Sequence, residues 1–162
     1  MENDLIEVRI GALILDPNTN TPIVVLKGVE SEVVLPIWVG AFEANAIALE
    51  IEKVVPQRPM THDLLRNLIL ECGLNSARVI VTDLLENTFY ASLEMADQEG
   101  RAVVMDARPS DAIALALRLD CPIFVRQSVL DLSSAPAEAD SNEPEAEDEV
   151  GGPEDWPDLI VD

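Results

Sequence analysis

The spacing of apolar residues changes at Gly40, and this change limits the chain to a fold that combines strands with helices. In residues 5–15, the polar Glu7 and Arg9 lie between apolar neighbours, an alternation typical of a strand with one buried face. After Gly40, apolar residues recur at helical spacing, which is typical of a helix packed on one side. Because both periods occur in one short chain, the sequence predicts an α+β fold.

Turn-forming residues divide the chain into short elements. Strands are expected over residues 5–15, 22–27, 31–39, 77–85, 88–96, 101–106 and 122–125. Helices are expected over residues 42–54, 61–72 and 109–119, and a closing turn over residues 129–132. Thr61 is a suitable N-cap for the second helix and Gly73 a suitable residue to end it, while Pro109 suits the start of the third. The first three strands are expected to form an antiparallel meander.

The chain carries a net charge of −21, and this charge is unevenly distributed. Residues 133–162 contain eleven of the 31 acids and no Lys or Arg, which leaves about −10 for the first 132 residues. An acidic surface repels nucleic acid at long range, because phosphate binding depends on neutralisation by Lys and Arg. A function on nucleic acid therefore requires a local basic cluster or metal ions. The acidity, with only two lysines among the ten bases, also fits a salt-rich cytoplasm.

Several classes of protein are disfavoured by what the sequence lacks. No apolar run approaches the roughly 18–20 residues of a membrane span, and residues 1–4 carry no basic leader. There is no zinc motif, P-loop, dinucleotide fingerprint or nucleophile elbow, so no organic cofactor is expected. Cys72 and Cys121 are isolated in apolar surroundings and are expected to be buried thiols. We therefore expect a soluble, cytoplasmic protein that binds no membrane.

The composition changes again near residue 133, where a single domain of residues 1–132 is expected to give way to an acidic tail. Residues 133–152 are rich in acids, Pro, Ser and Ala, so the tail is predicted to be disordered. Apolar residues return near the end of the chain, at Trp156, Leu159, Ile160 and Val161. Two interpretations stay open: this end is a short motif that binds a protein partner, or it folds back on the edge strand of its own domain.

Two related segments, residues 58–63 and 108–111, are the best place to look for chemistry. Each combines an Arg, a Pro, a hydroxyl and an acid at the start of an apolar helix. Free backbone N–H groups and the positive end of the helix dipole gather there, so such a position suits an anion or an acidic side chain. The first segment also contains His62, the only histidine of the chain.

Each of these residues has a functional and a local interpretation. His62 beside Asp63 could supply a general base or metal ligands, or Asp63 could simply favour the helix dipole while His62 lies on the surface. Arg58 and Arg108 could each bind a phosphate with two hydrogen bonds. Alternatively, each caps carbonyl groups or pairs with an acid, as Arg108 could with Asp106 or Asp111.

Several acids lie near the ends of predicted elements and could converge on a divalent cation. They are Glu43, Asp63, Asp83, Asp106 and Asp111. Oxygen ligands are those that Mg²⁺ and Mn²⁺ prefer, and such an ion could activate water for cleavage of a phosphodiester. For each acid taken singly, a capping or solvated role is the local interpretation.

Four segments in order resemble the bifunctional nuclease domain family. They are residues 35–44 (LPIWVGAFEA), 58–65 (RPMTHDLL), 83–91 and 106–116 (DARPSDAIALA). The third segment contains Asp83 and the run TFYA. The resemblance covers about residues 5–132 and leaves the tail outside. It implies an α+β domain with mixed, largely antiparallel β-sheets and about three packed helices, which forms a homodimer. It also implies nuclease activity on both DNA and RNA.

The motif residues that would line such a site follow from the same resemblance. They are Glu43, Arg58, Thr61, His62, Asp63, Asp83, Asp106, Arg108, Ser110 and Asp111. We assign catalysis to His62, Asp63 and Asp111, and we assign substrate binding to Arg58, Thr61, Arg108 and Ser110. Asp63, Asp106 and Asp111 are expected to hold Mg²⁺ or Mn²⁺. The alternatives are a non-catalytic dimeric interaction or regulatory module, and a pocket for a small phosphorylated ligand.

Overall fold

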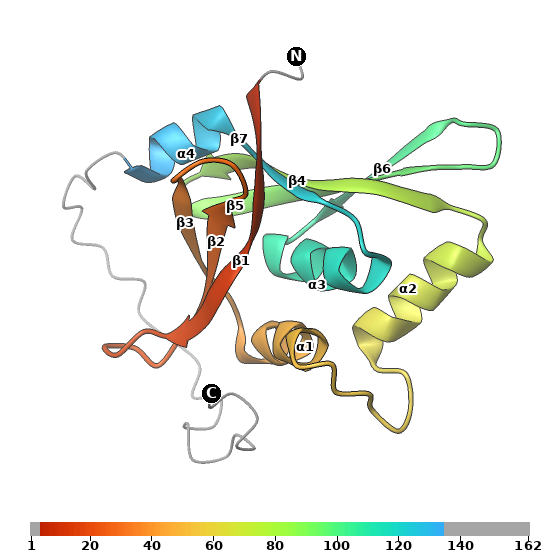
Figure 1. Ribbon diagram of the computed structural model, residues 1–162, viewed down its shortest axis with the longest axis horizontal. Coiled ribbons are helices and arrows are strands. Elements are labelled where there is room, and N and C mark those ends of the chain that lie inside the picture. Colours follow the sequence, from red (N-terminus) through yellow and green to blue (C-terminus); the bar gives the residue numbers. More distant parts are fainter. Residues whose placement is uncertain (1–3, 135–162) are drawn as a thin grey trace.

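The computed structural model describes residues 4–134, in which seven strands form one sheet in the order β3-β2-β1-β7-β4-β5-β6 (Figure 1). The strands are β1 (Leu5–Leu15), β2 (Pro22–Gly28), β3 (Val34–Trp38), β4 (Asn75–Leu85), β5 (Thr88–Ala96), β6 (Ala102–Ala107) and β7 (Ile123–Arg126). Among them only β4 and β7 pair in parallel. The expectation of a mixed, largely antiparallel α+β fold is therefore confirmed. The predicted acidic tail lies outside the described residues from residue 135 onward.

The described residues form four helices, one more than the sequence predicts. They are α1 (Ala41–Ile51), α2 (Thr61–Glu71), α3 (Pro109–Leu119) and α4 (Gln127–Ser134). The expected closing turn is the helix α4, which packs against β4 and β7 and buries Val129 and Leu130. In Figure 1, α4 lies at the opposite end of the molecule from α2. None of the helices in this part of the chain is long and apolar enough to cross a membrane.

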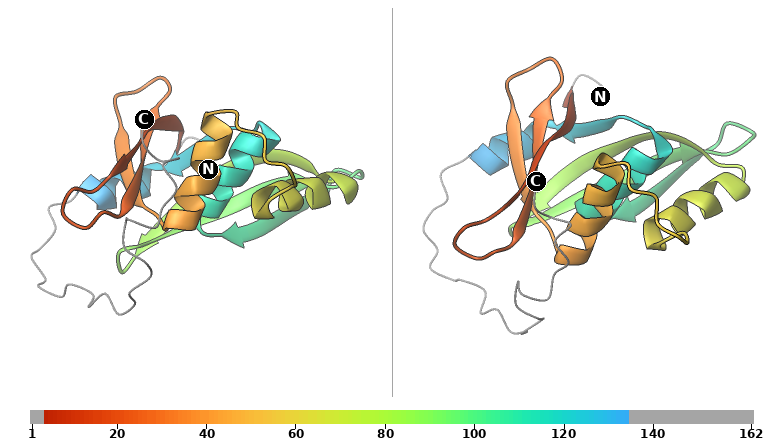
Figure 2. Two further views of the ribbon diagram at one scale, coloured as in Figure 1. Left: turned by 90° about the horizontal axis from the view of Figure 1, so that it is seen from below. Right: turned by 60° about the horizontal axis from the view of Figure 1, so that its bottom comes forward.

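The helices α1 and α3 lie side by side against the sheet (Figure 2). Both helices bury several alanines: Ala44, Ala46 and Ala48 in α1, and Ala112, Ala114 and Ala116 in α3. Because alanine side chains are short, two helices and a sheet can approach closely where they meet. This packing places the first turn of α3 beside the first turn of α1, where the candidate residues Glu43, Arg108 and Asp111 lie.

The helix α2 is packed differently, because none of its residues is buried. It packs on α3, and three of its leucines are about half exposed: Leu64 at 62%, Leu68 at 56% and Leu70 at 49%. The helix begins at Thr61, so Met60 and not Thr61 takes the N-cap position. It ends before Gly73, which has φ +73°, as the sequence predicts for a helix-terminating glycine. An amphipathic helix that leaves its apolar side uncovered creates room for something else to pack there.

The two cysteines differ from expectation in their exposure. Cys72, predicted to be buried, is exposed at the C-terminal end of α2, because the apolar side of that helix is not covered. Cys121 is partly buried, and burial raises the pKa of its thiol. Neither forms a disulfide, as the sequence predicts.

Candidate functional site

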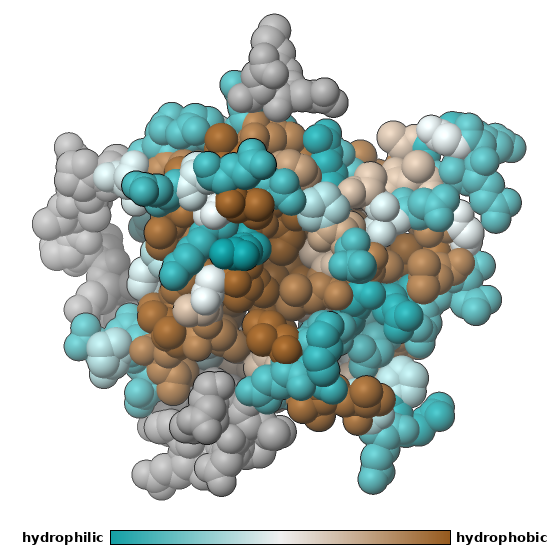
Figure 3. Space-filling model, in the orientation of Figure 1, coloured by the Kyte–Doolittle hydropathy of each residue, from teal (hydrophilic) through white to brown (hydrophobic). Residues whose placement is uncertain are grey.

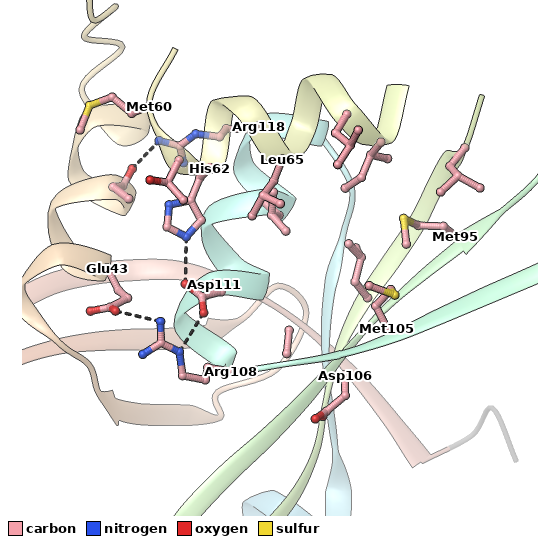
Figure 4. A pocket seen from close by; sticks show the side chains of 18 of the residues that line it. Glu43, Met60, His62, Leu65, Met95, Met105, Asp106, Arg108, Asp111 and Arg118 are labelled. Atoms are coloured by element: carbon pink, nitrogen blue, oxygen red, sulfur yellow. Dashed lines mark hydrogen bonds and ion pairs between the residues drawn. The ribbon is translucent and has the colours of Figure 1, made fainter. Parts of the chain in front are cut away.

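A pocket of about 780 Å³ lies between the helices α1, α2 and α3 and the strands β5 and β6 (Figure 4). One side is apolar. It is formed by Leu65, Leu68 and Ile69 of α2, Leu93 and Met95 of β5, and Val103 and Met105 of β6. Leu93 pairs with Met105, and Met95 with Val103, across the β5–β6 ladder, so all four side chains share one face of the sheet. The other side of the pocket is polar and contains most of the candidate residues.

The polar side brings the two sequence motifs together. His62 in the first turn of α2 and Asp111 in the first turn of α3 are in contact, with 2.9 Å between Nε2 and Oδ1. The two residues are 49 positions apart in the chain. The sequence suggested Asp63, the neighbour of His62, as its acidic partner. The structure corrects this, because the first turn of α2 packs on α3 and the imidazole points across to Asp111.

Arg108 extends this contact into a chain of four charged or titratable groups. Its Nε donates to Oδ2 of Asp111 at 2.8 Å, and its Nη2 donates to Oε1 of Glu43 at 2.9 Å. Pairing with Asp111, the local interpretation of Arg108, is therefore confirmed. The guanidinium nevertheless stays 66% exposed, so it can also contact a ligand. The hydrogen bond and charge of Asp111, and those of Glu43, raise the pKa of Arg108.

Asp111 is an ionised carboxylate at neutral pH. Burial by itself raises its pKa, but the hydrogen bonds with Arg108 and His62 and the charge of Arg108 outweigh burial and hold the pKa below its usual range. An ionised carboxylate only accepts hydrogen bonds, so we assign the proton of the neutral imidazole to Nε2 of His62. Nδ1 makes no hydrogen bond within residues 4–134, where every buried side-chain nitrogen and oxygen has a partner. Nδ1 is therefore open to solvent and free to accept a proton.

A second ion pair fixes the position of α2. Arg118 of α3 is 4% exposed, and its Nε donates to Oδ1 of Asp63 at 2.8 Å. Its other two nitrogens donate to the carbonyl groups of Ala114 at 3.0 Å and Ala46 at 2.9 Å. The other carboxylate oxygen of Asp63 accepts the backbone N–H of Met60 at 2.9 Å and so caps α2. One guanidinium thus joins α1, α2 and α3, and it holds the helix that carries His62.

Asp63 makes the stability of this fold depend on pH. Burial raises its pKa, but the hydrogen bonds from Met60 and Arg118 and the nearby positive charges outweigh burial, so the pKa is lowered. A carboxyl group with a lowered pKa in the folded state stabilises the fold above its ordinary pKa of about 3.9 and loses that effect as the pH falls. We expect Asp63→Asn to lower the free energy of unfolding by about 1 kcal/mol at pH 7, because the amide oxygen of Asn still accepts from Arg118 and only the charge and the cap of Met60 are lost. Urea unfolding from pH 7 to pH 2.5 should show that the difference in free energy of unfolding between the wild-type chain and Asp63→Asn closes below pH 4. A difference that stayed constant over this range would contradict the prediction.

The remaining predicted site residues do not all reach the pocket. Thr61 lines it, as does Asp106, which Figure 4 shows apart from the contact between His62 and Asp111. Ser110 is 6% exposed and does not line the pocket. Arg58 and Asp83 are exposed outside it.

The expected metal site at Asp63, Asp106 and Asp111 is not assembled. Within residues 4–134, no three or more His, Cys, Asp or Glu side chains are grouped so that they could hold a metal ion. The physical reason is that Arg118 and the N–H of Met60 occupy the oxygens of Asp63, while His62 and Arg108 occupy those of Asp111. These residues, as arranged, do not fit a divalent cation.

Arg118 is the residue that sequence reasoning missed. It lies outside both motifs, and a basic residue in the last turn of a helix is ordinarily explained by the helix dipole. The one signal in the sequence is the position of Arg118 between Leu117 and Leu119 on an otherwise apolar helix. A long charged side chain in such surroundings requires a buried partner.

The fold and the site together define a small α+β domain with a His–Asp–Arg cluster at the edge of an apolar pocket. The chain belongs to the bifunctional nuclease domain family, whose model matches residues 24–138. It is 44% identical over 124 residues to an uncharacterised protein of Mycobacterium tuberculosis, covering 76% of this chain and 73% of that one.

The chain is also similar to plant proteins that bear the family name. It is 26% identical over 101 residues to bifunctional nuclease 1 of Oryza sativa subsp. indica, and 28% identical over 101 residues to bifunctional nuclease 2 of Oryza sativa subsp. japonica. These matches cover 61% of this chain but only 30% and 31% of the plant proteins. The plant proteins therefore contain much that this chain does not match.

Proposed function

We propose that the chain hydrolyses phosphodiester bonds of DNA and RNA at the cluster of His62, Asp111 and Arg108. The observation that carries the proposal is the 2.9 Å contact between His62 and Asp111, because it leaves Nδ1 of the imidazole free as a base. An imidazole oriented by a carboxylate is a common general base, since its tautomer is fixed and its second nitrogen can accept a proton. Membership of the bifunctional nuclease domain family supports the substrate class.

The proposed step is the attack of a water molecule on phosphorus. Nδ1 of His62 takes a proton from the water as its oxygen bonds to phosphorus, and the bond between phosphorus and the leaving oxygen breaks. The leaving oxygen then takes a proton from the imidazolium, which returns His62 to its neutral form. Asp111 holds the ring and stabilises the imidazolium that forms, because an ionised carboxylate accepts from Nε2–H.

Arg108 would bind the phosphate in this scheme. Its guanidinium is 66% exposed at the polar side of the pocket, and its two ion pairs leave Nη1 without a hydrogen bond inside the described region. Hydrogen bonds from Arg to phosphate oxygens are stronger than neutral ones and neutralise developing charge. The positions of Glu43 and Asp111 fix the direction of the guanidinium before substrate arrives.

Arg108→Lys is expected to raise KM for a labelled oligonucleotide about 10-fold, corresponding to about 1.4 kcal/mol of binding. Lysine keeps the charge but cannot contact Glu43, Asp111 and a phosphate at once, because it lacks the planar fork of arginine. The matched control is Arg101→Lys, because Arg101 is 74% exposed, forms ion pairs with Asp97 and Glu99 and does not line the pocket. Equal KM values for the two variants would remove Arg108 from the substrate site.

No step in this scheme passes through a metal ion, because Asp63, Asp106 and Asp111 are not arranged as ligands. Dependence on a divalent cation is part of the assay: cleavage is measured with Mg²⁺, with Mn²⁺ and with EDTA. Cleavage in EDTA would support a base supplied by His62 alone. Strict dependence on a cation would mean that the substrate brings the cation or that the acids rearrange around it.

A second candidate function is supported by the apolar side of the pocket. The wall of leucines and methionines with Val103 offers nothing to a phosphate backbone, and it suits an apolar ligand or peptide. The overall acidity of the chain also favours an interaction module over a nuclease. The cleavage assay separates the two functions, because a binding module retains its ligand when His62 is replaced and cleaves nothing.

A further inference from the structure

We propose that residues 156–161 of this same chain bind in the apolar side of the pocket, between α2 and the strands β5 and β6. This inference concerns a binding surface and does not rest on the proposed nuclease activity. The pocket has uncovered apolar walls, apolar residues lie near the end of the chain, and the chain between them is long enough to join the two.

The walls of the pocket expose several large apolar side chains. On α2, Leu65 is 38% and Leu68 56% exposed, and across the pocket Met105 of β6 is 54% exposed. Figure 3 shows hydrophobic residues at the surface among hydrophilic ones on the face that it presents. Contiguous apolar patches on a soluble domain mark interaction sites. The volume of about 780 Å³ lies within the roughly 300–1,000 Å³ of pockets that enclose a ligand.

The chain carries a suitable occupant of its own. Between residue 135 and residue 155, the only large apolar side chain is Val150, whereas Trp156, Leu159, Ile160 and Val161 follow within six positions. Trp156 and Leu159 are three positions apart, so one short segment can present several apolar side chains to one groove. Removal of such side chains from water is the main driving force of association between apolar surfaces.

The length of the intervening chain allows this contact. The helix α4 ends at Ser134, and residues 135–155 supply 21 residues before Trp156. A flexible chain of that length has a root-mean-square span of about 25 Å and a maximum of about 70 Å. A domain of this size has a diameter of about 35 Å, so the segment reaches the pocket even though α4 and α2 lie at opposite ends. Tethering keeps the segment at an effective concentration near millimolar, which favours it over a separate partner.

The acidic residues of the segment favour its binding on the side of the pocket next to α2 and not on the polar side. Residues 154–162 contain four acids, whereas on the polar side Arg108 is already paired with Glu43 and Asp111, and Asp106 adds a further negative charge. Arg58 precedes α2 and Arg66 lies on it. Both are exposed, and neither forms an ion pair with another described residue. The segment can therefore place its apolar side chains in the pocket and its acids near these two arginines.

The test uses the full chain and the fluorescence of Trp156. The chain has two tryptophans, and Trp38→Phe leaves Trp156 as the only one; Trp38 is 53% exposed on β3 and does not line the pocket. In this background, Trp156 should emit at shorter wavelength than a free tryptophan peptide and should be quenched several-fold less by acrylamide. Both properties should be independent of protein concentration. Emission and quenching like those of the free peptide would overturn the proposal, and protection that grows with concentration would indicate binding to a second copy instead.

A matched pair of substitutions on α2 tests where the segment binds. Leu68→Gln places an amide in the pocket, whereas Leu70→Gln makes the same change on the same helix at a similarly exposed residue outside the pocket lining. We expect Leu68→Gln to expose Trp156 to quenching and Leu70→Gln to leave it protected. A third variant, Leu159→Asn with Ile160→Asn, changes only the segment and should also expose Trp156. Equal protection in all three variants would overturn the proposal.

Discussion

Replacing His62 with Gln is expected to slow cleavage of a labelled oligonucleotide by about 10²–10⁴-fold, the range that a general base contributes. The amide of Gln can still donate to Asp111, but it cannot take a proton from water. The contact between α2 and α3 is therefore retained while the chemistry is lost. Single-turnover cleavage of single-stranded RNA and DNA measures this rate directly, because it separates the chemical step from product release.

Leu70→Gln is the control for this prediction. It introduces the same side chain on the same helix, away from the pocket lining, and should leave the cleavage rate unchanged. Because His62 is the only histidine, no second imidazole can replace its function. If His62→Gln and Leu70→Gln cleaved at the same rate, His62 would not be the base.

Replacing Arg118 with Met is expected to lower the free energy of unfolding by about 3–5 kcal/mol, which is the usual cost of removing one partner of a buried ion pair. Methionine fills a similar volume but donates no hydrogen bond. The carboxylate of Asp63 then loses its ion pair, and the carbonyl groups of Ala46 and Ala114 lose a donor. Urea unfolding followed by far-UV circular dichroism gives the change in free energy.

The control for Arg118 is Arg101→Met. Arg101 also forms two ion pairs, but it is 74% exposed, so its loss should cost less than about 1 kcal/mol. The double variant Arg118→Met with Asp63→Asn should recover part of the lost stability, because it removes the unpaired charge. Equal losses for Arg118→Met and Arg101→Met would show that the buried ion pair does not hold the three helices together.

Local rules of sequence were sufficient for most of the fold. The alternation in residues 5–15 predicts a strand, and Pro109 predicts the start of a helix; each signal lies within a few positions of the chain. The strand β1 and the helix α3 occur with the predicted bounds. The helix α4 was expected as a turn over residues 129–132, because the apolar residues there span too few positions to show a helical period. Its stability depends on burial against β4 and β7, which no local pattern reports.

The candidate site could be predicted in part. Both helix starts were chosen from the sequence, and both contribute to one site. The partner of His62 was not predictable, because Asp111 is 49 residues away and comes near only when α2 packs on α3. The same packing turns Asp63 towards Arg118 and away from any shared metal ligand. Which neighbours an acid meets is decided by helix packing, and a single sequence does not record it.

The apolar side of the pocket was also invisible in the sequence. The leucines of α2 have the spacing of a helix packed on a core, and nothing in that spacing shows that the helix stays uncovered. Exposure of Leu68 and Cys72 is a property of the tertiary arrangement.

We would first measure cleavage by the wild-type chain and by Asp111→Asn, because this comparison tests the proposed site at His62, Asp111 and Arg108. The two proteins are purified in parallel and compared with Mg²⁺, Mn²⁺ or EDTA. Asparagine keeps the shape of Asp111 but removes the charge that orients His62 and pairs with Arg108. We expect the wild-type chain to cleave single-stranded RNA and DNA and Asp111→Asn to cleave at least 10²-fold more slowly. Equal cleavage by the two proteins, or none by either, would contradict a phosphodiesterase site at His62, Asp111 and Arg108.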